Sequence, residues 1–131
     1  MAKDLYIISE KAGDRMAQLT LAYEDGIMLA RITGEVTLLY SNELKCKIKE
    51  ELAKTNTDKV IIDLSKVPLL DSSGLGMLIS LFKYINEEKG QIVYAGLTDY
   101  VKKIVGFAKL DKIFTIVDSV ESGMQLLKEN K

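Results

Sequence analysis

Hydrophobic and polar residues follow different periods in successive parts of the chain, and these periods predict its elements. In residues 19–24, Leu, Leu and Tyr alternate with Thr, Ala and Glu, which is the period of a half-buried strand. Glu24-Asp25-Gly26 is a favourable sequence for a tight turn, and residues 27–32 are again strand-like. The two runs therefore predict an antiparallel hairpin.

From about residue 27 onward, strand-like and helix-like segments alternate. The expected segments, in order, are a helix over 41–54, a strand at 60–62, a helix from 72 to about 89, a strand at 92–95, a helix from 98 or 99 to about 108, a turn at 109–111, a strand at 113–117 and a helix from 118 or 119 to about 127. Ser41 is the candidate N-cap of the first helix, and Gly90 is the candidate left-handed residue after the second. The alternation predicts one α/β domain, with a mostly parallel mixed sheet of about five strands, one of them antiparallel, and about four α-helices.

The first residues precede this pattern and are ambiguous. Residues 5–8 are apolar and could add an edge strand or simply pack against the domain, and Gly13-Asp14 then breaks the segment. We therefore divide the chain into an N-terminal extension, residues 1–15, and a domain at 16–131.

The most informative stretch runs from Val60 to Ile85. A short apolar run at 60–62 reads as a buried strand, and a link containing Pro68 follows it. Asp71-Ser72-Ser73-Gly74 then carries the small polar side chains that accept bonds from the first turn of a helix. The unit is a strand, a loop and a helix, with two serines where the helix begins.

The residues at this helix start leave three interpretations open. The backbone amides and the positive end of the helix dipole suit an anion, including a phosphate on Ser72 or Ser73. Gly74-Leu75-Gly76 could open a dinucleotide fingerprint, although Ile79 stands where the third glycine belongs. Alternatively, both serines merely cap a helix of the core.

Composition and charge narrow the function classes. The chain has 131 residues, of which 47% are hydrophobic, enough for a single core. Its 18 basic and 19 acidic residues are well mixed, so neither a nucleic-acid stripe nor a patch for anionic membranes is expected. No apolar run approaches the roughly 20 residues that cross a bilayer, and the first residues lack the apolar centre of a secretion signal. A cytoplasmic protein is expected.

The chain has one cysteine and no histidine, and both facts limit its chemistry. Cys46 lies among Lys45, Lys47 and Lys49, which favour a thiolate, but without a histidine base a surface thiol is the simpler interpretation. Hydrolysis by a Ser-His-Asp triad and most zinc sites are excluded. No cluster suggests a metal or another cofactor, so none is expected.

Several separated motifs resemble one known family, the STAS domain family of bacterial anti-sigma-factor antagonists. The motifs are Val60–Ser65 with Asp71–Gly76, Gly34-Glu35-Val36-Thr37 with Glu43-Leu44, Leu110–Phe114, and Ser119–Leu127. They stand in the family's order and cover about residues 16–128. The resemblance implies a STAS-type fold.

The resemblance also implies partner switching rather than catalysis. In this family the unphosphorylated protein binds an anti-sigma factor, which is also a serine kinase, and so releases a sigma factor. The kinase phosphorylates the first serine of the Asp-Ser-Ser/Thr-Gly motif, here Ser72, and a serine phosphatase reverses the reaction. The chain is thus expected to be a binder and a substrate, not an enzyme, and a monomer or weak dimer.

The expected partner-binding residues come from the two central motifs. They are Glu35, Thr37, Asp71, Ser72, Ser73, Gly74 and Leu75. The family usually carries an aspartate where this chain has Thr37, which puts the standard partner contact in question and makes Thr37 a second candidate phosphorylation site. We expect free amides and the helix dipole to hold a phosphate on Ser72, beside Asp71 and near Asp63, where its charge would oppose docking.

Two other roles remain alternatives. One is a STAS module that binds a nucleotide at the same helix start. The other is a structural STAS subunit of a transporter or of a stress-signalling complex.

Overall fold

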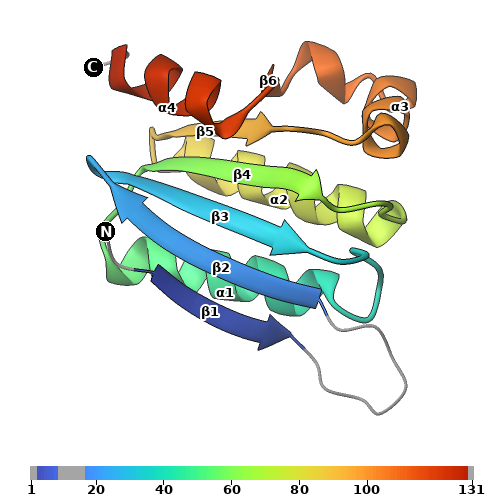
Figure 1. Cartoon of the computed structure of the whole chain (residues 1–131), viewed down its shortest axis with the longest axis horizontal. Coiled ribbons are helices and arrows are strands. Elements are labelled where there is room, and N and C mark those ends of the chain that lie inside the picture. The colour runs from blue at the N-terminus through green and yellow to red at the C-terminus, as the bar shows by residue number, and fades with distance from the viewer. Residues whose placement is uncertain (1–2, 9–16, 130–131) are drawn as a thin grey trace.

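The computed structural model describes residues 3–8 and 17–129, which form one sheet with helices on both faces (Figure 1). The elements are β1 (Lys3–Ile8), β2 (Ala17–Glu24), β3 (Ile27–Thr33), α1 (Ser41–Lys54), β4 (Lys59–Lys66), α2 (Ser72–Glu87), β5 (Gln91–Ala95), α3 (Asp99–Phe107), η1 (Leu110–Lys112), β6 (Thr115–Val117) and α4 (Val120–Glu129). The predicted α/β class and the alternation of strands and helices are confirmed.

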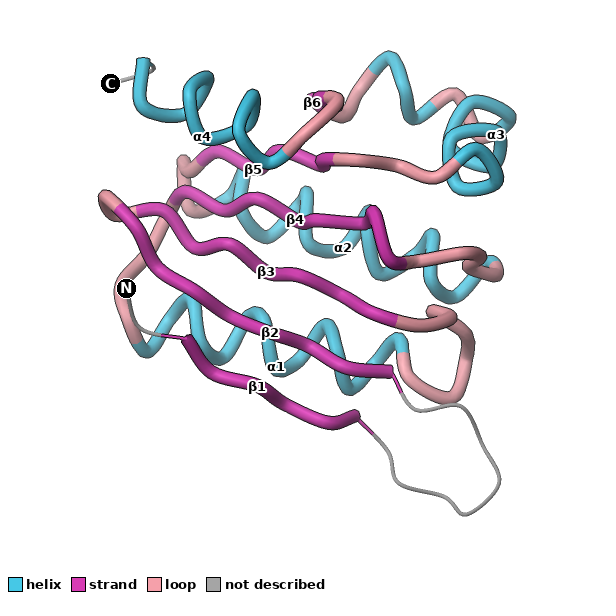
Figure 2. The backbone as a smooth tube through the Cα atoms, viewed as in Figure 1, coloured by secondary structure: helices cyan, strands magenta, loops and turns pink. Residues whose placement is uncertain are grey.

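The sheet has six strands in the order β1-β2-β3-β4-β5-β6. β1, β2 and β3 pair antiparallel, and β3, β4, β5 and β6 pair parallel. The carboxyl ends of the parallel strands β3, β4 and β5 lead into the loops before α1, α2 and α3. These three loops therefore lie along the same edge of the sheet (Figure 2).

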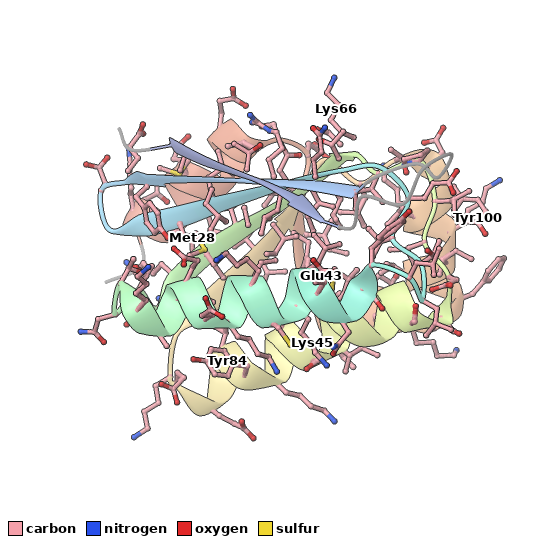
Figure 3. The ribbon with its side chains drawn as sticks, turned by 90° about the horizontal axis from the view of Figure 1, so that it is seen from below. Met28, Glu43, Lys45, Lys66, Tyr84 and Tyr100 are labelled. Carbon is pink, nitrogen blue, oxygen red and sulfur yellow. The ribbon has the colours of Figure 1, made fainter. Side chains whose placement is uncertain are left out.

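The two faces of the sheet bury different residues. In β4, Val60, Ile62 and Leu64 are fully buried in the large core between the sheet and the two helices α1 and α2. These helices lie side by side below the sheet (Figure 3). Ile61 points the other way, into a smaller core under α4. Each fully buried side chain of this size contributes about 1.5–3 kcal/mol, so β4, buried on both faces, holds the two cores together.

The predicted hairpin is confirmed at β2 and β3. Its turn places Asp25 at φ 55° and Gly26 at φ 77°. Positive φ at both central residues matches the right-handed twist of the strands, and Asp-Gly is a preferred pair for it.

Three local predictions were wrong. Tyr40, not Ser41, is the N-cap of α1, and Ser41 is a buried residue inside the helix whose amide donates to the carbonyl of Thr37. The last strand is shorter than predicted, because Ile113 and Phe114 donate to the carbonyl of Leu110 and close the η1 turn.

The third wrong prediction is Gly90. Lys89, at φ 60°, takes the left-handed conformation after α2. Gly90 is needed for another reason, since a Cβ there would lie 2.1 Å from the carbonyl oxygen of Asp58. A glycine is thus required at this position because the backbone packs closely against Asp58, and not because of a left-handed φ.

Candidate functional site

Asp71 is the N-cap of α2 and joins two loops of the site. Its Oδ1 accepts the backbone amides of Ser73 at 2.9 Å and Gly74 at 3.0 Å, together with the hydroxyl of Ser73. Its Oδ2 accepts the amide of Leu38, 3.0 Å away, from the loop before α1. A single carboxylate therefore satisfies the start of one helix and holds the approach to another.

Backbone hydrogen bonds continue the pairing of β3 and β4 into these loops. Gly34 donates to the carbonyl of Lys66 and Val36 to that of Leu69, while the amide of Asp71 donates back to Val36. An isolated parallel bridge joins Val36 and Leu70. Both predicted motifs, distant in sequence, thus lie side by side.

Gly74 allows this close approach. A Cβ at Gly74 would lie 2.5 Å from the carbonyl oxygen of Val36 and 2.8 Å from the Cβ of Leu70. Both distances are shorter than van der Waals contact, so a larger residue would push the two loops apart.

The two serines occupy different environments. Ser72, the first residue of α2, is exposed, and its hydroxyl makes no hydrogen bond to the described part of the chain. Ser73 is partly buried, and its hydroxyl is engaged by Asp71. Of the two, Ser72 offers the accessible nucleophilic oxygen. The interpretation that both serines cap the helix was wrong, because Asp71 is the cap.

Two of the amides at the start of α2 are not free, contrary to the prediction. Those of Ser73 and Gly74 already donate to Asp71, so a phosphate on Ser72 would stand beside a carboxylate that holds these donors. The Ser73 hydroxyl bond to Asp71, together with bonds from backbone amides, outweighs the opposing effect of burial and lowers the pKa of this carboxyl below its ordinary value. Asp71 therefore stays ionised at neutral pH.

Asp63 lies elsewhere than its predicted place near Ser72. It is buried on the α4 side of the sheet, where its Oδ2 accepts a hydrogen bond from Nε of Arg31 at 2.7 Å. Burial acts to raise the pKa of Asp63, but the hydrogen bonds from Arg31 and Ser65 outweigh it and lower the pKa. Asp63 thus stabilises the adjoining ends of β3 and β4 and does not belong to the Ser72 site.

The remaining predicted residues surround the helix start. Glu35 and Thr37 are partly exposed in the loop before α1, where the carbonyl of Thr37 accepts the amides of Tyr40 and Ser41. Leu75 is partly buried and packs against the core. Except for Gly74, which is buried, the predicted residues all keep some exposure.

Two residues of the site escaped the sequence analysis. Leu38 and Leu39 are 77% and 57% exposed, and Leu38 is tied directly to Asp71. The sequence did offer one signal for them: two adjacent leucines stand in the loop before α1, where no helix or strand needs them for its buried face. Large exposed apolar side chains beside a polar site are typical of a protein-binding surface.

Other chemistry finds little support. Gly74 and Gly76 lie inside α2, so no glycine-rich loop precedes the helix as a dinucleotide fingerprint requires. Cys46 is exposed. Within residues 3–8 and 17–129, no group of three Cys, Asp or Glu side chains is placed to hold a metal ion. No helix in the same ranges is long and apolar enough to cross a membrane.

Comparison with known proteins identifies the family of the chain. The model of the STAS domain matches residues 18–123. The anti-sigma F factor antagonist of Paenibacillus polymyxa is 24% identical over 102 residues, which cover 78% of this chain and 87% of that protein.

Solved structures have the same fold. An anti-sigma factor antagonist from Mycobacterium paratuberculosis aligns with a TM-score of 0.77 at 20% identity, covering 86% of this chain and 94% of the other. The Bacillus cell fate determinant SpoIIAA in its phosphorylated form aligns with a TM-score of 0.66 at 16% identity, covering 82% and 96%. With the family model spanning most of the sequence, and with the Asp71–Gly74 motif seated at the start of α2, the chain belongs to the STAS domain family.

Proposed function

We propose that this chain is an anti-sigma-factor antagonist and that phosphorylation of Ser72 switches off its binding to an anti-sigma factor that is also a serine kinase. A serine phosphatase acting on phospho-Ser72 restores binding. The names of the relatives support the general role, since one is an anti-sigma F factor antagonist and another an anti-sigma-B factor antagonist.

The observation that carries the proposal is the exposed hydroxyl of Ser72 at the first position of α2. A kinase must reach this oxygen, and no hydrogen bond to the described residues has to break first. The neighbouring Ser73 is the poorer acceptor of a phosphoryl group, because its hydroxyl is bound to Asp71.

The proposed docking surface, called the Ser72 surface, extends the predicted set by the two exposed leucines. It comprises Glu35, Thr37, Leu38, Leu39, Asp71, Ser72, Ser73, Gly74 and Leu75. Leu38 and Leu39 supply exposed apolar area. Ser72 is close to them because it follows Asp71, whose carboxylate accepts a hydrogen bond from the backbone amide of Leu38.

The switch follows from local electrostatics. Phosphorylation adds about −1.5 to −2 charges at neutral pH. The new group stands beside ionised Asp71, which already holds the amides of Ser73 and Gly74. A partner covering the surface would desolvate both anions, and an unpaired charge buried in an interface commonly costs about 2–5 kcal/mol. That cost weakens binding by a factor of about thirty or more, since about 1.4 kcal/mol is tenfold.

The test is a pulldown from the source cells with three forms of the full chain, read by mass spectrometry. Wild type and Ser72→Ala should capture the same anti-sigma factor, and Ser72→Glu should lose it. Incubation of wild type with ATP and the captured kinase should add one phosphate, at Ser72. Ser122→Glu is the matched control, because Ser122 is exposed in the first turn of α4 on the opposite face of the sheet.

Normal capture of the anti-sigma factor by Ser72→Glu, with phosphate found at Thr37 or Ser73 instead, contradicts the proposed switch. Capture of a transporter or stress-signalling assembly that is indifferent to Ser72 contradicts the proposed role itself.

A further inference from the structure

The face of the sheet that carries α4 is only partly covered. α4 packs on β4, β5 and β6 (Figure 1). Beside it, apolar side chains of β2 and β3 line an open groove. This α4 groove has a volume of about 560 Å³. Its apolar lining comprises Ala22, Ile27, Leu29, Val120 and Met124. The volume and lining are typical of a site that takes apolar side chains, and Met124 can adapt to their shape.

The rim of the α4 groove is acidic. Glu24, Glu121, Glu129 and Lys128 line it. The Nζ of Lys128 lies 2.9 Å from Oδ2 of Asp25 and 3.9 Å from Oε2 of Glu24, so carboxylates of the hairpin already balance its charge. Glu121 and Glu129 leave the rim with negative charge. An occupant with apolar side chains flanked by cations would complement it.

A surface with exposed apolar side chains flanked by lysines lies on α3 and η1 of the same chain. Tyr100 and Phe107 of α3 are 48% and 83% exposed, and Ile113, just beyond η1, is 56% exposed. Figure 3 shows Tyr100 at the outer edge of the molecule. This α3 surface also includes the exposed lysines Lys102, Lys103, Lys109 and Lys112, which outnumber its exposed aspartates, Asp99 and Asp111, and leave it with net positive charge.

The spacing on α3 suits docking into a groove. Tyr100, Lys103 and Phe107 stand at positions i, i+3 and i+7, so they share one side of the helix. Val101 and Val105 are buried on the opposite side and anchor α3 to the core. An exposed helix face with anchors at this spacing is the usual form of helix-in-groove recognition.

We propose that the α3 surface of one copy docks into the α4 groove of a second copy. The apolar anchors fill the groove, and the lysines face Glu121 and Glu129. Because α3 and the groove lie at opposite ends of the sheet, each bound copy still offers one unused surface (Figure 1). The contact is therefore head-to-tail, and assembly can continue beyond a dimer. It is independent of the Ser72 surface.

Sedimentation equilibrium of the full chain, from low micromolar to millimolar concentration, tests the proposal. The average mass of wild type should rise with concentration, and less so at high salt, which screens the lysine–glutamate pairs. Phe107→Glu removes the main anchor, and Glu121→Lys with Glu129→Lys reverses the rim. Each variant alone should associate at least tenfold more weakly. Glu87→Lys with Glu88→Lys makes the same change of charge at two exposed glutamates at the end of α2, outside both surfaces, and should associate as wild type does.

Mixing the two defective variants makes the test specific. Phe107→Glu keeps an intact groove, and the reversed-rim variant keeps an intact α3 surface. Their equimolar mixture should form dimers and nothing larger, because each partner supplies one working surface. Circular dichroism confirms that both variants fold.

Two outcomes overturn the proposal. The first is that wild type stays monomeric at millimolar concentration, which would leave the groove to a basic helix of another protein. The second is that wild type associates and both variants do so equally well, which places the contact elsewhere.

Discussion

At the scale of single residues, Asp71 has the largest share in building the Ser72 site. It is exposed, yet its carboxylate receives bonds from Leu38, Ser73 and Gly74. Each bond satisfies a backbone donor at the start of α2 or in the loop before α1. Removing the side chain therefore breaks the hydrogen bonds that hold both the first turn of α2 and the loop before α1.

We predict that Asp71→Ala lowers the free energy of unfolding by about 1–2 kcal/mol, the upper part of the range for loss of an N-cap. Asp71→Asn keeps an acceptor oxygen and should cost less. Urea denaturation followed by circular dichroism measures both. Asp111→Ala, at an exposed aspartate of η1, is the control. A loss no greater than that of the control would show that the cap contributes little.

At the scale of elements, α2 carries two glycines with opposite surroundings. Gly74 faces Val36 and Leu70, with no room for a Cβ, whereas nothing lies within 4 Å of a Cβ at Gly76. The first glycine serves contact between the loops, and the second only loosens the helix. Their substitutions should therefore differ in sign.

Gly76→Ala should raise the free energy of unfolding by about 0.4–1 kcal/mol, because alanine restricts the unfolded chain and fits the helix. Gly74→Ala should lower it by about 1–3 kcal/mol, the usual cost of overpacking. The two midpoints in urea, measured side by side, check the pair. If both variants shifted in the same direction, the packing of Gly74 against Val36 would be refuted.

At the scale of the whole molecule, two aspartates make stability depend on acid. The pKa values of Asp63 and Asp71 are lowered from the ordinary value of 3.8. A carboxyl whose pKa is lower in the folded state binds its proton more readily in the unfolded chain. Its stabilisation is fully present above the unfolded pKa and is lost as the pH falls through the folded one.

We therefore predict that the free energy of unfolding is steady near neutral pH and falls as the pH drops below about 4. Asp63→Asn should flatten this fall, because it removes a titrating group that is paired with Arg31 and buried at 3% exposure. Urea midpoints at a series of pH values measure the slope. Asp111→Asn controls for the change in net charge. An unchanged slope in Asp63→Asn would contradict the prediction.

The order of the elements could be read from the chain because periodicity is local. The hairpin turn at Asp25-Gly26, the alternation of strands and helices, and the helix start at Asp71–Gly74 all appear where they were expected. Each depends on side chains a few residues apart, and short-range geometry dominates there.

The details that failed depend on contacts between distant segments. The N-cap of α1 is Tyr40 and not the predicted Ser41. The left-handed residue after α2 is Lys89 and not the predicted Gly90. The close approach of Asp58 to Gly90 and of Val36 to Gly74 has no signal in the local pattern. Likewise, the local pattern does not show that Asp63 pairs with Arg31 of the neighbouring strand.

The amino-acid sequence by itself determined the fold class, the family resemblance and Ser72 as the candidate hydroxyl, since local pattern and motif suffice for these. Only the tertiary structure decided that Asp71 already holds the amides of Ser73 and Gly74, that the loop with the exposed Leu38 and Leu39 lies beside the start of α2, and that α4 leaves a groove open. The physical reason is that contacts between distant segments decide which acceptor each hydrogen-bond donor finds and which apolar surfaces are buried.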